Sequence, residues 1–293
     1  MLQKKVVESF CISLEALGRA ERTLEANRER LGGLQKFLTK QRVVEIEHIS
    51  PELLDAYISS SYRKGLSTFT VAGRVQVIKT FFNWSVKRRY IKTSPASHLK
   101  KPLLNYSAKN RAMRQEDLEK MILFACKRNN LMVEVMLMLF ADTGCRSGEL
   151  CGMNKEDIDF VKKEVWVTGK TGERLLDFTF KTVIKLGVYT EARGKMDLST
   201  RSLFVNSDGK RINPRQIYGR FRAIAKELKI KRFNPQSIRH RVGQGWLDQG
   251  ANLETVRQKL GHKDIQTTAL FYSHQDRERL KIASQKFCLV KNM

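Results

Sequence analysis

The stretch from Gln236 to His274 reads QSIRHRVGQGWLDQGANLETVRQKLGHKDIQTTALFYSH and contains several side chains of the kinds that carry chemistry. It holds Arg239, a Leu-Gly-His turn that ends at His262, and Tyr272, which follows that histidine by ten residues. None of the three is diagnostic alone. Their meaning therefore depends on which residues elsewhere in the chain join them.

Two short helices are predicted within this stretch. The first carries Arg239, begins at Asn234 or Pro235, and has Gly250 where a C-terminal cap glycine is expected. The second covers ANLETVRQKLGH, and a further turn follows from Thr267 to Tyr272.

Upstream, a second arginine follows a strongly apolar segment. RAMRQEDLEKMILFACK predicts one helix, and LMVEVMLMLFADTG predicts a buried helix that Gly144 terminates. Arg146 comes next in CRSGEL, and Glu149, at i+3, shares its helix face. Two interpretations of Glu149 stay open. It orients the Arg146 guanidinium, or it forms an ordinary surface ion pair.

The pattern then changes to short β-branched and aromatic runs, IDFVKKEVWVTGKTGERLLDFTF. These runs predict a small antiparallel sheet with Lys170 at the tip of a hairpin. The Gly-x-x-x-x-Gly-Lys-Ser/Thr spacing of a phosphate-binding P-loop is absent. Helical patterns return in KTVIKLGVYTEAR and PRQIYGRFRAIAKELKI.

The N-terminal part, residues 1–99, reads as helical throughout. Ser50 is expected to cap a helix that has Pro51 in its first position, and Ser67 or Thr68 to cap the next. The first helix has apolar residues at helical spacing: Val6, Phe10, Ile12 and Leu17. Three aromatic residues are interpreted as core rather than as base-stacking groups: Phe81, Phe82 and Trp84.

Charge points to a polyanionic partner. The chain has a formal net charge of +25 and a pI near 10.1. Residues 1–110 contain 20 Lys and Arg against 9 Asp and Glu, and residues 111–293 contain 35 against 21. Both parts are therefore basic, as expected for double-stranded DNA, because Lys and Arg release condensed counterions when they neutralise phosphates. The residues predicted to grip DNA are Arg63, Lys64, Arg74, Lys79, Lys87 and Arg88.

Composition also indicates how the chain divides into domains and argues against a metalloprotein or a membrane protein. SPASHLKKPLLNYSAKN predicts a linker at 100–111 between an N-terminal domain, 1–99, and a C-terminal domain, 112–293. The five cysteines form no Cys-x-x-Cys or Cys/His cluster, so reduced thiols and no metal site are expected. No apolar run reaches the roughly 18 residues of a membrane span, and we expect a cytoplasmic protein, associated with the nucleoid if its source is bacterial or archaeal.

The order of these motifs resembles the tyrosine recombinase (phage integrase) family. The resemblance is strongest in TGCRSGEL, in IRH followed by WLDQG, and in KLGHKDIQTTALFYSH, and it covers essentially the whole chain. It implies a mainly α fold with a small antiparallel sheet, in which an N-terminal SAM-like helical bundle precedes the catalytic domain. It also implies a site-specific recombinase that cleaves and rejoins DNA without a cofactor or metal.

The family's site residues carry over onto five positions. Tyr272 corresponds to the nucleophile that leaves a 3′-phosphotyrosine and a free 5′-hydroxyl. Arg146 and Arg239 correspond to the clamp on the non-bridging oxygens. Lys170 corresponds to the general acid for the leaving 5′-oxygen, and His262 to a hydrogen-bond donor to the phosphoryl group.

One position departs from the family pattern. A histidine normally stands three residues before the second arginine, where this chain has Gln236. A glutamine amide donates a hydrogen bond but cannot shuttle a proton. His240, four residues after Gln236, either compensates at the site or packs in the core.

Assembly and activity leave alternatives. The family resemblance implies a tetramer that acts on two duplexes through a Holliday junction. The tail SHQDRERLKIASQKF then docks on a neighbouring protomer or on its own domain. Gln236 also fits a sequence-specific DNA-binding protein with weakened catalysis. A type IB topoisomerase-like relaxase shares the same chemistry.

Overall fold

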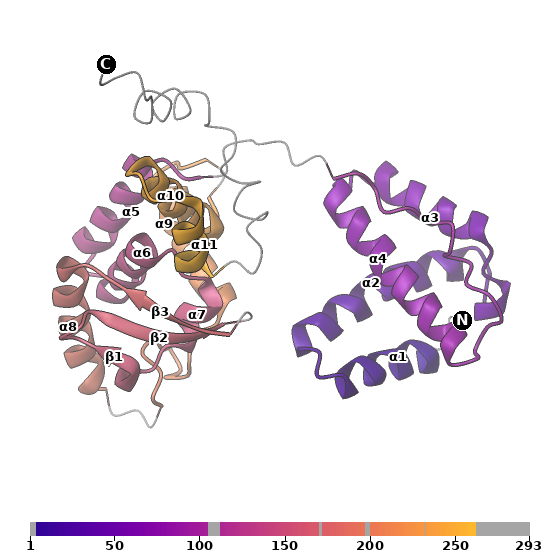
Figure 1. Cartoon of the computed structure of the whole chain (residues 1–293), viewed down its shortest axis with the longest axis horizontal. Helices are drawn as coiled ribbons and strands as arrows, with labels where there is room; N and C mark the ends of the chain where they lie inside the picture. Colours follow the sequence, from indigo (N-terminus) through magenta and orange to yellow (C-terminus); the bar gives the residue numbers. More distant parts are fainter. Residues whose placement is uncertain (1–3, 105–111, 170–171, 197–199, 232, 262–293) are drawn as a thin grey trace, which may run out of the picture. The chain divides into compact units, whose positions relative to one another are not determined.

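The chain divides into two compact units, Met1–Tyr106 and Ser107–Met293. The computed structural model describes residues 4–104, 112–169, 172–196, 200–231 and 233–261 (Figure 1). Both units are mainly helical, and the second contains a three-stranded antiparallel sheet. The predicted fold class is therefore confirmed.

Four α-helices form the described part of the N-terminal unit: α1 (Lys4–Ala16), α2 (Glu21–Lys40), α3 (Pro51–Arg63) and α4 (Thr68–Lys87). The hydroxyl of Ser50 accepts a hydrogen bond from Leu53 N at 3.4 Å, and Pro51 follows as the first residue of α3. Ser67, rather than Thr68, caps α4 by accepting from Thr70 N at 3.3 Å.

Aromatic residues fill the core of this unit, as predicted. Phe81 and Phe82 are fully buried, and Trp84 packs against the same cluster. The Phe10 ring meets the Phe81 ring edge-on, with 5.5 Å between centroids. These rings are therefore structural and are not free to stack on bases.

The prediction for the first helix was partly wrong. Val6 and Phe10 are buried, but Ile12 is 56% exposed and Leu17 is 72% exposed. A residue two positions after Phe10 points to nearly the opposite side of a helix, away from the side of α1 that contacts α2 and α4. Leu17 lies beyond the end of α1.

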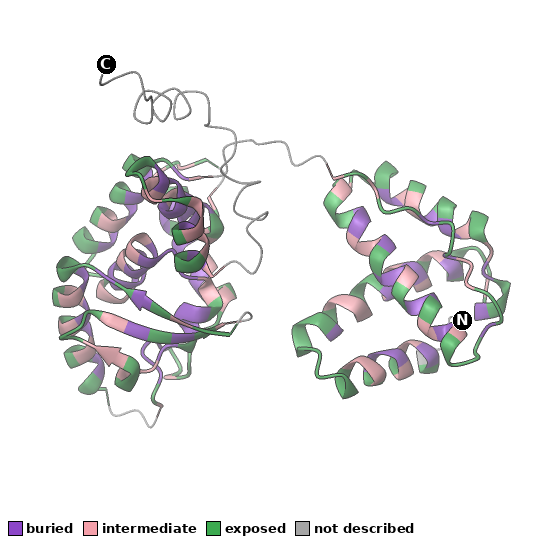
Figure 2. Ribbon diagram, in the orientation of Figure 1, coloured by how far each residue is buried: buried purple, intermediate pink, exposed green. Residues whose placement is uncertain are grey.

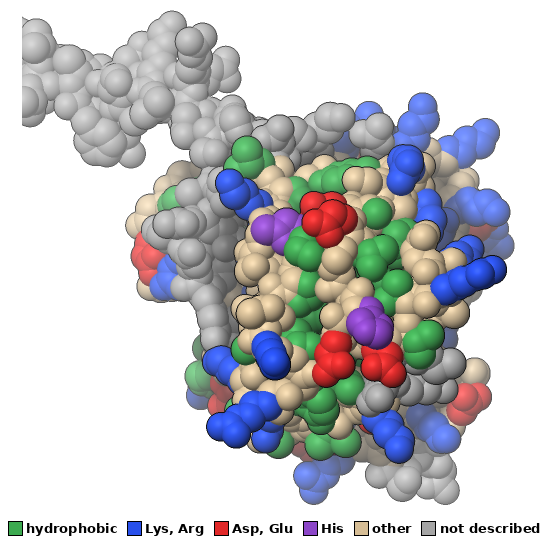
Figure 3. Space-filling model, turned by 90° about the vertical axis from the view of Figure 1, so that its right-hand side faces the viewer, with side chains coloured by type: hydrophobic (Ala, Val, Ile, Leu, Met, Phe, Trp, Pro, Cys, Tyr) green, Lys and Arg blue, Asp and Glu red, His purple; other side chains and the backbone are tan. Residues whose placement is uncertain are grey.

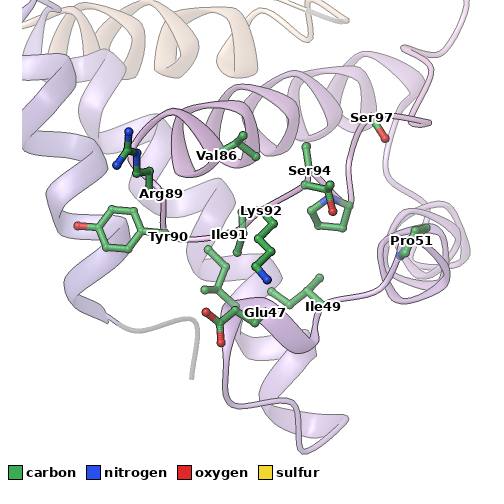
Figure 4. Close-up of a pocket in the computed structure, with 13 residues that line it drawn as sticks. Glu47, Ile49, Pro51, Val86, Arg89, Tyr90, Ile91, Lys92, Ser94 and Ser97 are labelled. Carbon is green, nitrogen blue, oxygen red and sulfur yellow. The ribbon is translucent and has the colours of Figure 1, made fainter.

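An open groove of about 1020 Å³ lies between the segment before α3 and the segment after α4 (Figure 4). Its lining mixes apolar and polar side chains, and its charged members, Glu47, Arg89 and Lys92, are of both signs. Figure 3 shows a face of this unit with apolar side chains at its centre and Lys and Arg gathered towards its margins. Neither feature concentrates positive charge as a phosphate site requires.

The C-terminal unit is built around one buried helix, α6 (Leu131–Thr143). Buried residues occur on nearly all sides of α6 (Figure 2), which packs against its neighbours along the chain and in space. The surrounding helices are α5 (Gln115–Lys127), α7 (Ser147–Gly152), α8 (Phe180–Gly194), α9 (Pro214–Glu227), α10 (Pro235–Asp248) and α11 (Leu253–Leu260). The sheet consists of β1 (Ile158–Asp159), β2 (Glu164–Gly169) and β3 (Gly172–Asp177), in the order β1-β2-β3.

Two glycines with left-handed backbone close helices at the same place. Gly144 ends α6 with φ 56°, and Gly261 ends α11 with φ 66°. A Cβ on Gly144 would lie 2.8 Å from Leu260 Cδ2, so α11 packs directly on the end of α6. α10 begins at Pro235, because Asn234 caps it by accepting from Ser237 N at 2.9 Å.

Candidate functional site

Arg146 stands at the junction of α6 and α7, and Glu149 holds it there. The carboxylate accepts from the Arg146 backbone N–H at 2.7 Å and from Nη1 at 2.8 Å. The Arg146 side chain is 30% exposed, whereas that of Glu149 is 1% exposed. The burial favours an orienting role for Glu149 over that of an ordinary surface ion pair.

Arg239 is buried in α10, with 1% of its surface exposed. Its Nη1 donates to the Gly144 carbonyl at 2.7 Å, and its Nη2 donates to the Leu260 carbonyl. Its Nε has no hydrogen-bond partner within the part of the chain that the structure describes. Burial, together with the charges of Arg146 and Arg174, lowers the pKa of Arg239 to about 10.

A third guanidinium completes the cluster and comes from Arg174 on β3. It contacts Glu149 through Nη2 at 2.8 Å and through Nε at 3.3 Å. Its Nη1 donates to the Lys259 carbonyl. Burial opposes ionisation of Glu149, but the hydrogen bonds and charges of Arg174 and Arg146 outweigh it, so the pKa of Glu149 is lowered.

All three arginines donate hydrogen bonds to backbone carbonyls at the C-terminal end of α11. Consecutive carbonyls of Lys259, Leu260 and Gly261 accept from Arg174, Arg239 and Arg146 respectively, the last at 2.7 Å. These are the carbonyls that an α-helix leaves without intrahelical partners. The three arginines therefore fix the end of α11 to α7, α10 and β3.

Charge at this centre is unbalanced. The described residues contribute three guanidiniums and one carboxylate, an excess of two positive charges in a largely buried place. Buried cations are costly unless they are paired, so the arrangement favours an anionic ligand. The class of site is thus a cationic, anion-binding centre.

The other residues predicted for the site divide into two groups. Gln236 is exposed near the start of α10, one turn before Arg239, and His240 is buried. Lys170, His262 and Tyr272 lie outside the described residues. The predictions for these three stay predictions.

The arginine that sequence reasoning missed had a visible signal. Alternation along β3 places Arg174 on the same face as Leu176, which is 2% exposed, and opposite the buried Val167 of β2. Trp166 and Leu175 pair on the other, exposed face. A charged residue on the buried face of a strand requires a partner, and Glu149 is that partner.

The basic residues predicted to grip DNA differ in their freedom. Four are exposed: Arg63, Lys64, Lys87 and Arg88. Arg74 is half-buried, donates to Ser61 Oγ at 2.8 Å, and lies over the Tyr57 ring at 5.4 Å. Lys79 donates to the Leu99 carbonyl at 2.7 Å. These internal bonds occupy the two side chains within the bundle.

The described residues lack two features that would point to other functions. No helix among them is long and apolar enough to span a bilayer. No three His, Cys, Asp or Glu side chains among them gather closely enough to hold a metal ion.

Comparison with known proteins places this architecture. Residues 111–279 match the phage integrase family, and residues 7–89 match the phage integrase N-terminal SAM-like domain. The tyrosine recombinase XerC of Corynebacterium glutamicum is 29% identical over 286 residues, covering 96% of this chain and 91% of that protein. The XerC of Thermodesulfovibrio yellowstonii is 29% identical over 276 residues, covering 90% and 89%.

Solved structures share the fold. The XerH site-specific recombinase, bound to a palindromic difH substrate in a post-cleavage complex, has a TM-score of 0.75 at 18% identity. That match covers 95% of this chain and 83% of XerH. The Tn1549 transposon integrase, bound to transposon right end DNA, has a TM-score of 0.73 at 18% identity, covering 94% and 99%. The chain belongs to the phage integrase family.

Proposed function

We propose that this chain is a site-specific DNA recombinase that breaks and rejoins strands through a 3′-phosphotyrosine. The observation that carries the proposal is the largely buried cluster of Arg146, Arg174 and Arg239 around the carboxylate of Glu149. The basic excess in both parts of the chain supports DNA as the anion. The named relatives, which are recombinases and integrases, support the same reaction.

Two arginines are assigned to the phosphate. Arg146 is partly exposed, and Arg239 keeps an Nε–H with no acceptor among the described residues. Donors held in place before the reaction stabilise the charge that develops on the non-bridging oxygens of a pentacoordinate phosphorus. Such positioned donors each contribute about 10²–10³ in rate in other enzymes.

The covalent step follows from the assigned roles. The Tyr272 oxygen attacks phosphorus and gives up its proton to solvent water, the bond from phosphorus to the 5′-oxygen breaks, and Lys170 protonates that oxygen. His262 and Gln236 donate hydrogen bonds to the phosphoryl group. In the reverse direction a 5′-hydroxyl of the partner strand attacks the phosphorus and gives its proton to Lys170. The bond from phosphorus to the Tyr272 oxygen breaks and the tyrosine takes up a proton from water, so no external energy source is needed.

Assembly is part of the proposal. Exchange between two duplexes needs four active centres, so we assign a homotetramer that passes through a Holliday junction. The enzyme acts on chromosomal or mobile-element DNA, in the cytoplasm and associated with the nucleoid.

Covalent capture tests the function. A duplex selected for binding from a randomised pool is nicked near the cleavage position, so that the cut fragment diffuses away and the adduct accumulates. Wild-type protein should give a denaturant-stable protein–DNA adduct, and Tyr272→Phe should give none. Tyr62→Phe serves as a matched control, because Tyr62 is an exposed tyrosine of α3, outside the proposed site. An adduct with Tyr272→Phe would overturn the assigned nucleophile.

One observation favours a second candidate, a DNA-binding protein with weakened catalysis. Gln236 cannot move a proton, and His240, the nearest substitute on α10, is buried. Tight, sequence-selective binding by wild-type protein without any adduct would favour this candidate over the recombinase.

A further inference from the structure

Arg174 uses its planar fork in two directions at once. The Nε and Nη2 edge meets Glu149 at 3.3 and 2.8 Å, while Nη1 donates to the Lys259 carbonyl. Its side chain is only 10% exposed, although it starts from a strand of a small sheet. A lysine keeps the charge but offers a point contact instead of a fork. The position is therefore specific for arginine.

The segments next to two of the assigned catalytic residues rest on this pair. A Cβ on Gly169, the residue before Lys170, would lie 2.7 Å from Glu149 Oε1. A Cβ on Gly261, the residue before His262, would lie 2.9 Å from Arg174 Cδ. Only a residue without a side chain permits such close approach. The Glu149–Arg174 pair is thus a common support for the hairpin and for the end of α11.

We propose that Arg174 is a positioning residue that aims Arg146 at the scissile phosphate, an inference that rests on the proposed recombinase function. Arg146 has two anchors, the Glu149 carboxylate at 2.8 Å and the Gly261 carbonyl at 2.7 Å. Arg174 touches both, because it binds Glu149 directly and packs beneath Gly261. Arg174 itself makes no contact with the substrate in this role.

Loss of the fork loosens both anchors together. Arg146 is 30% exposed, so it can turn towards solvent once Glu149 and Gly261 shift. A misplacement of about 1 Å in a catalytic group costs about 10²-fold in rate. The loss must be largest where the reaction depends on neutralising a charged non-bridging oxygen, which is the task assigned to Arg146.

A neutral substrate separates positioning from folding. Two nicked duplexes are compared, one with the natural phosphodiester and one with a methylphosphonate, in which a methyl group replaces a non-bridging oxygen and removes the charge. The variant is Arg174→Lys, which keeps a cation beside Glu149. The matched control is Arg211→Lys, because Arg211 also holds backbone carbonyls, those of Cys151 at 2.8 Å and Met153 at 3.2 Å, at the other end of α7.

The expected result is a selective loss. Arg174→Lys should form adduct on the phosphodiester about 10- to 100-fold more slowly than wild type, with the methylphosphonate rate changed less than about threefold. Arg211→Lys should leave the ratio of the two rates at its wild-type value. Equal loss on both substrates, or no loss on either, overturns the role of Arg174. Absence of an adduct with the wild-type protein on both substrates overturns the proposed function as well.

Discussion

Replacing Glu149 with glutamine should destabilise the C-terminal unit strongly. Each carboxylate oxygen accepts two donors: Oε1 from Arg146 Nη1 and Arg174 Nε, and Oε2 from Arg146 N and Arg174 Nη2. A glutamine keeps one oxygen and sets an NH₂ group against two donors. It also leaves three guanidiniums without a counter-charge, those of Arg174 and Arg239 largely buried and that of Arg146 partly exposed. Breaking a buried ion pair on one side costs about 3–5 kcal/mol, and we expect a loss of that size.

Denaturant titration measures this loss of unfolding free energy, provided that the unfolding of each unit is monitored separately. The N-terminal unit contains Trp84, and the C-terminal unit contains Trp166 and Trp246. In a Trp84→Phe background, fluorescence therefore reports the C-terminal unit. The matched control is Glu134→Gln, since Glu134 is also buried but pairs with a single lysine, Lys185, at 2.8 Å. That control should cost only about 1 kcal/mol.

The pH dependence of the unfolding free energy tests whether the charge of the Glu149 carboxylate is the cause of the stabilisation. The folded pKa of Glu149 lies below its unfolded value, which is about 4.3 for a glutamate. Its stabilisation is therefore complete above that unfolded value and is lost as the pH falls through the folded pKa. The difference in the free energy of unfolding between wild type and Glu149→Gln should have its full size at pH 7 and should become smaller below about pH 4. A difference in unfolding free energy that stays constant down to pH 2.5 would refute this reasoning. So would a difference below about 1 kcal/mol at pH 7.

Four further outcomes are expected. Arg239→Lys should reduce adduct formation about 10²–10³-fold on a nicked duplex, since a lysine cannot reproduce the fork; an undiminished rate would contradict this. Gly261→Ala should lower the free energy of unfolding by about 1–3 kcal/mol in denaturant titrations, because its Cβ meets Arg174 at a positive φ. Gln236→His should preserve or raise the cleavage rate in single-turnover assays, and a large loss would show that Gln236 is misplaced. Lys87→Ala should weaken DNA binding. In fluorescence titrations the slope of log K against log salt concentration should become shallower by about one, and an unchanged slope would show that Lys87 is not part of the interface.

Local sequence patterns predicted correctly where α6 ends and which residue lies beside Arg146. Gly144 was expected to end α6, and it does so with a left-handed φ of 56°. Glu149 was expected to share a face with Arg146, and the two are in contact. Both predictions depend on residues less than one helical turn apart, where propensity and spacing act directly.

Long-range contacts could not be predicted in the same way. No spacing rule connects Arg174 on β3 with Glu149 on α7 and with Lys259 at the end of α11. The alternation along β3 shows only that Arg174 faces the buried side of the sheet. Similarly, the basic residues of α4 look alike in sequence, yet Lys79 is bonded to the Leu99 carbonyl while Lys87 is exposed. Tertiary packing decides which of them are free.

The choice of acceptors at the end of α11 explains how this centre stays cationic. Guanidiniums held by carboxylates would be fixed in place but neutralised, and a phosphate would gain little by binding there. Here one carboxylate, Glu149, sets the orientation of Arg146 and Arg174, and carbonyls supply the other anchors. A carbonyl at a helix C-terminus carries only a partial negative charge, so it orients a guanidinium without cancelling it. The excess of two charges is thus preserved for an anion, while the donors are already in place before that anion arrives.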